Sequence, residues 1–195
     1  GVLTILYLNT VQPSLIKNKT SIHIKIINNT NQNLERLKIK FNEDDIRKFL
    51  FSTKFIFQNI DRVQIFDEKY ELLGDTDSLD LDPRAFSQRI DIIEMNNLNN
   101  SKKLKIKENK SKKDLNDKKI FEDLKKYSIS SDYGKPYTYT ENSYDQFLLV
   151  TIKNVIYDDK NIGYLAISEN ANDIKAAIDE RKNFVIRTAL LVAIV

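Results

Sequence analysis

Cysteine is absent from this 195-residue sequence, and histidine occurs once, at His23. Without thiols, neither a disulfide framework nor a thiolate metal site can form. A lone histidine has no companions for a catalytic triad or a zinc site, which excludes classical hydrolase and zinc chemistry. The chain also lacks a large net charge. The 31 basic and 28 acidic residues leave a net charge of +3, which argues against a nucleic-acid partner.

No apolar run reaches the roughly 20 residues that a membrane-spanning helix needs. Two shorter runs lie at the ends, Gly1 to Leu8 and Phe184 to Val195. We expect each to be part of a longer membrane helix, because the last residues have no solvated helical face and no secretory cleavage site follows the first run. The alternative is a pair of amphipathic helices of a soluble protein, with Arg187 and Thr188 facing water.

Between these runs, a hydrophobic content of 41% is enough for one domain with a real core. Asn42 is a predicted N-cap, since first-turn carboxylates follow it. Leu34 to Phe41 alternates apolar and charged residues, as a half-buried strand does. Other helices are predicted at 9–33, where Pro13 interrupts the pattern, at Ile120 to Tyr127, and from Asn170 to Arg187.

Two antiparallel hairpins are also predicted, which makes the fold class α+β. The first pairs Arg62 to Asp67 with Tyr70 to Thr76 across a charged turn that lacks glycine. The second pairs Phe147 to Ile156 with Asn161 to Ser168. It is richer in apolar and β-branched residues, so we expect it to be the more deeply buried of the two.

Two groups of side chains are candidate sites. Crowded carboxylates at Asp75, Asp77, Asp80 and Asp82 would suit acid sensing or divalent-cation binding, although their spacing is not that of an EF-hand loop and a solvated turn is the plainer interpretation. A small ligand or a partner protein could instead lie against the sheet beside Arg84, Tyr133 and Tyr137, although half-buried strand tyrosines are more common.

Two further features have plain interpretations. His23 is expected to be an exposed or half-packed residue of the first helix. Residues 96–119 are dense in Asn and Lys and are expected to form a mobile, solvated loop, although a Lys-rich run can also bind an acidic partner or anionic lipid head groups.

Four segments resemble the stimulus-sensing region of the alphaproteobacterial ChvG/ExoS-type sensor histidine kinases. They are Leu6 to Asn9, Asp61 to Asp67 with Leu72 to Thr76, Ile162 to Ser168, and Ile174 with Arg187 at the entry into the last apolar run. The hairpin motifs are shared by many PAS-like (PDC or Cache) sensors, whereas the two membrane-flanking segments narrow the match. The Lys/Asn-rich loop has no counterpart in that family.

The resemblance implies a PAS-like antiparallel sheet with a long N-terminal helix and a C-terminal helix leading into the membrane. The expected divisions are the end of a first membrane helix at 1–8, a membrane-exit helix at 9–33, a periplasmic sensor domain at 34–169, a signalling helix at 170–183 and the start of a second membrane helix at 184–195.

The same resemblance implies a homodimer in the bacterial inner membrane that senses acid, envelope stress, a ligand or a periplasmic regulator protein. Kinase activity, with its ATP, magnesium and response regulator, would belong to a cytoplasmic portion outside these residues, and His23 would not be the phosphoacceptor. In residues 1–195 we expect no catalytic site, metal or cofactor. The alternatives are the sensor of a chemoreceptor and a non-catalytic membrane adaptor that docks a periplasmic partner.

Overall fold

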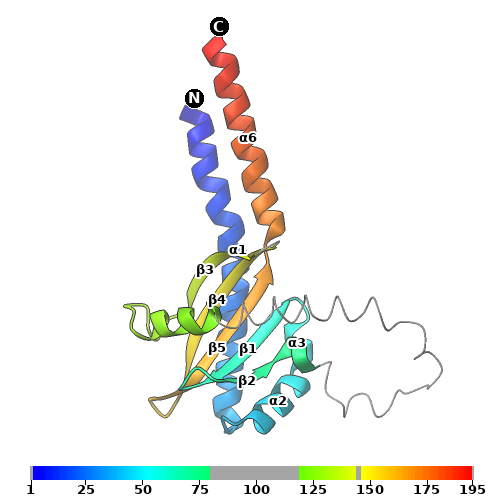
Figure 1. Ribbon diagram of the computed structural model, residues 1–195, viewed down its shortest axis with the longest axis vertical. Coiled ribbons are helices and arrows are strands. Elements are labelled where there is room, and N and C mark those ends of the chain that lie inside the picture. Colours follow the sequence, from blue (N-terminus) through cyan, green and yellow to red (C-terminus); the bar gives the residue numbers. More distant parts are fainter. Residues whose placement is uncertain (1, 80–118, 144–145, 195) are drawn as a thin grey trace, which may run out of the picture.

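Five antiparallel strands form one sheet in the order β2-β1-β5-β4-β3 (Figure 1). The computed structural model describes residues 2–79, 119–143 and 146–194. Within these ranges the elements are α1 (Val2–Arg36), α2 (Glu43–Ser52), the 3-10 helix η1 (Lys54–Phe57), β1 (Arg62–Asp67), β2 (Leu72–Asp75), α3 (Thr76–Leu79), a helix at 119–128, β3 (Tyr137–Ser143), β4 (Gln146–Tyr157), β5 (Lys160–Asn170) and α6 (Asn172–Ile194). The predicted α+β, PAS-like sheet with a long helix at each end is confirmed.

Different elements cover the two faces of the sheet, because successive side chains of a strand point to opposite sides. One face packs on α1 and α2, in a core that includes Val63, Ile65, Leu165 and Ile167 of the strands and Ile27, Leu34 and Ile46 of the helices. The other face packs on the helix at 119–128, in a core that includes Phe66, Val150, Tyr164 and Ala166 of the strands and Ile120, Leu124 and Tyr127 of that helix.

Both predicted hairpins form, and neither turn uses glycine. In the β1–β2 turn the Asp67 carboxylate accepts hydrogen bonds from the backbone N–H groups of Lys69 and Glu71, each at 2.8 Å. The β4–β5 turn places Asp158 and Asp159 at φ values of 48° and 63°. Aspartate tolerates this left-handed region better than most residues, and two such residues in succession suit a tight hairpin turn.

The predicted start of α2 is also confirmed. The Asn42 side-chain oxygen accepts the backbone N–H of Asp45 at 2.9 Å, which satisfies one of the free donors of the first turn. The helix then buries Ile46, Phe49 and Leu50. The predicted helices at Ile120 to Tyr127 and from Asn170 onward correspond to the helix at 119–128 and to α6.

The strand predicted at Leu34 to Phe41 is wrong, because α1 continues to Arg36 and no strand follows before α2. Leu34 is fully buried and lies at helical spacing from Ile27, which is also fully buried. Packing of this helical face on the sheet therefore prevails over the local alternation of polarity. Pro13 does not divide the helix, which is continuous from Val2.

Beyond one end of the sheet α1 and α6 run side by side, and both chain ends lie at the far end of this pair (Figure 1). In this part α6 exposes large apolar side chains, including Leu191 (68% exposed) and Val192 (72% exposed). Among the described helices, none combines the length and the apolarity needed to span a bilayer. The partial membrane segments expected at 1–8 and 184–195 stay a prediction.

Gly74 marks the close approach of β2 to α2. A Cβ atom at this position would lie 2.8 Å from Ile46 Cγ2 and 2.8 Å from Leu50 Cδ1. We therefore predict that Gly74→Ala lowers the free energy of unfolding by about 1–3 kcal/mol, since overpacking displaces buried side chains. Urea denaturation followed by circular dichroism measures this. Lys48→Ala on the exposed side of α2 is the control, and equal losses in both variants would contradict the prediction.

Candidate functional site

A pocket of about 440 Å³ lies on the sheet face opposite α1, and we call it the sheet pocket. Its lining is mostly polar and comprises Asp61, Arg62, Gln64, Asp77, Glu141, Gln146, Ser168 and Asn170, together with the apolar Ile120, Leu148 and Val150. Charged groups, amides and a few apolar surfaces in one concave site are what a small polar ligand needs for orientation and burial.

A guanidinium group is fixed at the wall of the sheet pocket. Arg62 donates to both carboxylate oxygens of Asp75, from Nη2 at 2.6 Å and from Nε at 3.1 Å. Its Nε also lies 3.4 Å from the carboxylate of Asp77. The Asp75 side chain is buried, with 1% exposure, and that of Arg62 is 14% exposed. Such a two-pronged pair fixes the plane of the guanidinium as well as its position.

The carboxylate candidates are thus partly located. Asp75 and Asp77 come together, and both lie against Arg62. Asp80, Asp82 and Arg84 lie outside the described residues, as does most of the predicted loop at 96–119. Within the described ranges no group of three or more His, Cys, Asp or Glu side chains could hold a metal ion. Acid or cation sensing by this segment stays a prediction.

Tyr133, in the turn before β3, and Tyr137, the first residue of β3, lie beside Tyr127 of the core on the pocket side of the sheet, but neither lines the sheet pocket. Both rings pack on Tyr127, with centroid distances of 5.8 Å and 6.5 Å. The Tyr127 hydroxyl donates to the carbonyl of Lys135 at 2.8 Å and accepts the N–H of Gly134 at 3.1 Å, and burial raises the pKa of this hydroxyl. The arrangement anchors the turn that carries Tyr133. A ligand role for the two exposed rings stays a prediction.

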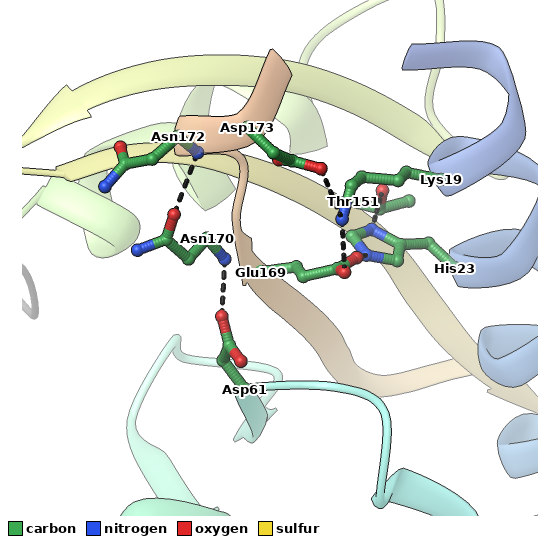
Figure 2. A network of polar contacts seen from close by, with 8 residues as sticks. All are labelled: Lys19, His23, Asp61, Thr151, Glu169, Asn170, Asn172 and Asp173. Carbon is green, nitrogen blue, oxygen red and sulfur yellow. Dashed lines mark hydrogen bonds and ion pairs between the residues drawn. The ribbon is translucent and has the colours of Figure 1, made fainter. Parts of the chain in front are cut away.

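A second polar cluster lies on the α1 side of the sheet (Figure 2). His23 is fully buried there, with Nδ1 2.9 Å from Thr151 Oγ1 and Nε2 2.9 Å from Glu169 Oε2. Lys19 donates to the other oxygen of Glu169, Oε1, at 2.7 Å. We call these four residues the His23 cluster. It joins α1 to β4 and β5 through directional bonds.

The electrostatics of the His23 cluster favour a neutral imidazole. Burial is the largest effect and lowers the pKa of His23, against the hydrogen bond and the negative charge of Glu169, which raise it. The positive charge of Lys19 lowers the pKa of His23 further, whereas the more distant Asp61 raises it. Lys19 also approaches Asp173 at the start of α6, at 3.8 Å.

The expectation that His23 is exposed or half-packed is therefore wrong. His23 lies on the same face of α1 as the buried Ile27, Thr30 and Leu34, at intervals of four, three and four residues. This spacing is the helical signal that could have identified it. Polar residues at two of these positions obscured the buried face, because an apolar pattern search passes over a histidine and a threonine.

β5 lies between the sheet pocket and the His23 cluster. Ser168 and Asn170 line the pocket, whereas Glu169 between them points to α1, as the alternation of a strand requires. Asp61, which also lines the pocket, accepts the backbone N–H of Asn170 (Figure 2). The Asn170 side chain in turn accepts the N–H of Asn172, the first residue of α6, at 2.8 Å.

No protein-family model and no curated protein matches this chain. Similar solved structures include the sensory domain of the Campylobacter jejuni chemoreceptor Tlp3 (CcmL) with isoleucine bound, with a TM-score of 0.49 and 12% identity, covering 88% of this chain and 60% of that one. The Tlp3 ligand-binding domain in complex with L-valine gives a TM-score of 0.47, also at 12% identity over 88% and 60% of the two chains. This chain therefore spans less than two thirds of those chains. Likenesses this distant do not show what this chain does.

The Arg62–Asp75 pair leads to a stability prediction. Asp75→Asn removes one charge of a largely buried pair, so we expect the free energy of unfolding to fall by about 3 kcal/mol. Asp77 is 52% exposed, and Asp77→Asn should cost less than about 1 kcal/mol because water screens that contact. Urea denaturation of both variants tests this. A similar small loss in the two variants would show that the Arg62–Asp75 pair does not stabilise the hairpin.

Proposed function

We propose that this chain is the extracytoplasmic sensor domain of a membrane-bound bacterial signalling protein. One observation carries the proposal: consecutive residues of β5 face the sheet pocket and α1 in turn, and α6 begins two residues after the strand ends. A shift of Ser168 or Asn170 in the pocket would therefore also move β5, the strand that contacts α1 and leads into α6. We expect this region to lie in the periplasm, next to the inner membrane.

The two long helices support a membrane location. They run side by side away from the sheet and bring both chain ends to the same side (Figure 1). Large apolar side chains stay exposed on the distal part of α6, among them Phe184, Leu190 and Leu191. Soluble monomers rarely expose an apolar patch of this kind, and contact with lipid or with neighbouring membrane helices would remove its cost.

The proposed mechanism has two states. A stimulus that favours one position of β5 relative to α1 displaces the start of α6, which passes the displacement inward. Asp61 is well placed for this step, because it lines the pocket and also binds the backbone N–H of Asn170. The stimulus would act by changing hydrogen bonds at the end of β5, without requiring a catalytic step in this domain.

The resemblance to ChvG/ExoS-type proteins supports a homodimeric histidine kinase as the whole protein, with ATP, magnesium and a response regulator serving its cytoplasmic portion. A periplasmic regulator protein is one candidate stimulus. The residues that follow Val195 test this part of the proposal: a phosphoacceptor histidine box followed by ATP-binding motifs would support a kinase, whereas a long heptad hairpin without them would indicate a chemoreceptor.

The location is tested with topology reporters in the full-length gene product. We predict that alkaline phosphatase inserted into the exposed turn at 129–136 is active, since the enzyme folds only outside the cytoplasm. A fluorescent protein that requires the cytoplasm should be dark at the same position. A fluorescent reporter with an inactive phosphatase would reject the extracytoplasmic location.

Signal transfer through α6 is tested by uncoupling it. Ser168→Leu partly fills the sheet pocket and should shift the basal output of the full-length protein. A few glycines inserted between Ala171 and Asn172 should abolish that shift while circular dichroism shows a folded domain, because glycine interrupts the rigid path into the helix. The same insertion between Ser131 and Asp132 is the control and should preserve it. An unchanged shift in the first insertion variant would contradict coupling through α6.

A further inference from the structure

We propose that the His23 cluster is an acid-released latch: uptake of one proton by His23 loosens α1 from β4 and β5. The role of such a latch in signalling rests on the function proposed above. The latch itself is a property of this chain and is tested on the chain alone.

The closed latch fits a neutral imidazole. Nε2 faces the carboxylate of Glu169, so it carries the hydrogen and donates to Oε2. Nδ1 then has a lone pair and accepts the hydroxyl of Thr151 at 2.9 Å. Thr138 Oγ1 lies 2.9 Å from Thr151 Oγ1 and supplies a hydrogen to that hydroxyl oxygen in turn. Every polar atom in this chain of bonds is satisfied when the ring is uncharged.

A second proton on the ring disturbs this arrangement. Nδ1 would then donate to Thr151, whose own hydrogen must turn toward Thr138, so the chain of hydroxyl bonds reverses. The new positive charge would also be fully buried, since His23 has 0% exposure. A buried charge is tolerated only when it is well paired. The latch therefore depends on which charges face the ring.

The facing charges do not supply a free counter-ion. From α1, Lys19 already pairs with Glu169 of β5 at 2.7 Å, so an imidazolium would share one carboxylate with an ammonium. From α6, Asp173 is 68% exposed, and water screens it. Asp61, before β1, is engaged with the backbone N–H of Asn170. The sides formed by β4 and β3 present the hydroxyls of Thr151 and Thr138.

A fall in pH favours the open state of the latch. Burial lowers the pKa of His23 in the closed state, whereas a ring released into water regains its ordinary value of about 6.5. Above that pH neither state binds the proton, and the closed latch is fully stable. As the pH falls below about 6.5 the open state gains the proton first, and the ratio of open to closed rises by up to about tenfold per pH unit until the closed-state pKa is reached.

The latch lies where β5 leads into α6. Lys19 and His23 both bind Glu169, which is flanked by two residues of the sheet pocket and lies three residues before α6. Loss of these bonds lets the turn of α1 from Lys19 to His23 shift relative to α6, while Asn28 and Asn31 still hold the next turns of α1 on β4. The stimulus class that this site fits is therefore an extracytoplasmic fall in pH, acting on the α1 side of the sheet and not through the pocket.

The first experiment measures the protonation of the ring directly. His23 is the only histidine of the chain, so each of the two carbon-bound protons of its ring gives one NMR signal, which can be titrated without assignment to a residue. We expect a pKa below about 6.5 in the 195-residue chain. Lys19→Met should raise the pKa of His23 by removing the competing cation, and Glu169→Gln should lower it by removing the carboxylate.

Lys17→Met is the matched control for Lys19→Met. Lys17 is an exposed lysine of the same helix outside the His23 cluster, so its removal should leave the titration unchanged. A pKa of His23 at or above its ordinary value in the native chain would overturn the proposal. So would shifts of the same sign in the Lys19 and Glu169 variants, because the ring would then not be titrating between these two charges.

The second experiment measures opening. The chain has no cysteine, so spin labels can be placed at Asn18→Cys on α1 and Thr140→Cys on β3, both exposed positions. The distance distribution between the labels should broaden between about pH 7.5 and about pH 5.5 in the native background, on either side of the ordinary histidine pKa. His23→Gln, which keeps an amide donor toward Glu169, should remove that broadening.

A second variant tests the latch independently, in case His23→Gln does not fold. Lys19→Met leaves Glu169 to the imidazolium alone, so acid should open this variant less than the native chain. Equal acid-induced broadening with and without His23, or none in the native chain, would overturn the latch. Neither result bears on the topology and glycine-insertion tests, so failure of the latch and failure of the sensor role are distinguishable.

Discussion

A single carboxylate, that of Glu169, holds the first helix of the chain against the strand that precedes the last helix. Its two oxygens accept from Lys19 and His23, one turn apart on α1. Apolar packing favours burial but has little directional preference. The two bonds to Glu169, together with the bonds of Asn28 and Asn31 to β4, therefore fix the position of α1 on the sheet, and Ile27 and Leu34 pack on the sheet core in that register.

Polar groups are fixed on both faces of the sheet. On one face the Arg62–Asp75 pair orients the wall of a pocket, and on the other the imidazole of His23 completes its bonds through Thr151. The two sites are separated by the thickness of one strand. Under the proposed function, this closeness would let a small rearrangement on either side reach the end of β5, where Asn170 accepts the first N–H of α6.

Local patterns predicted most of the fold because local forces dominate there. The hairpin alternation and the Asn42 cap each specify structure within a few residues. The strand predicted at Leu34 to Phe41 was wrong because the alternation of this segment fits a strand, while Leu34 also completes the buried face of a helix. Only contact with the sheet decides between the two. The predicted exposure of His23 was wrong for a related reason, since its buried position depends on a bond to Glu169, which is 146 residues away in the sequence.

The candidate site was less predictable than the fold. Crowding of Asp75 and Asp77 is visible in the sequence, but their shared contact with Arg62 requires the pairing of β1 with β2. The pocket combines side chains from β1, β3, β4 and β5 with Asp61, Asp77 and Ile120, and no local spacing marks such a set. Tyr133 and Tyr137 were recognisable as strand-flanking aromatics, although their packing on Tyr127 was not.

The alternation of β5 has an evolutionary consequence. Ser168 can be exchanged without altering Glu169 or the Asn170 side chain that accepts the first N–H of α6, so under the proposed function the pocket surface and the contacts to the two helices can diversify separately. Insertion or deletion of one residue within β5 would instead exchange the two faces and destroy both properties at once. Descendants of this domain should therefore vary more at Ser168 than at Asn170 and Glu169, while keeping the strand's length constant.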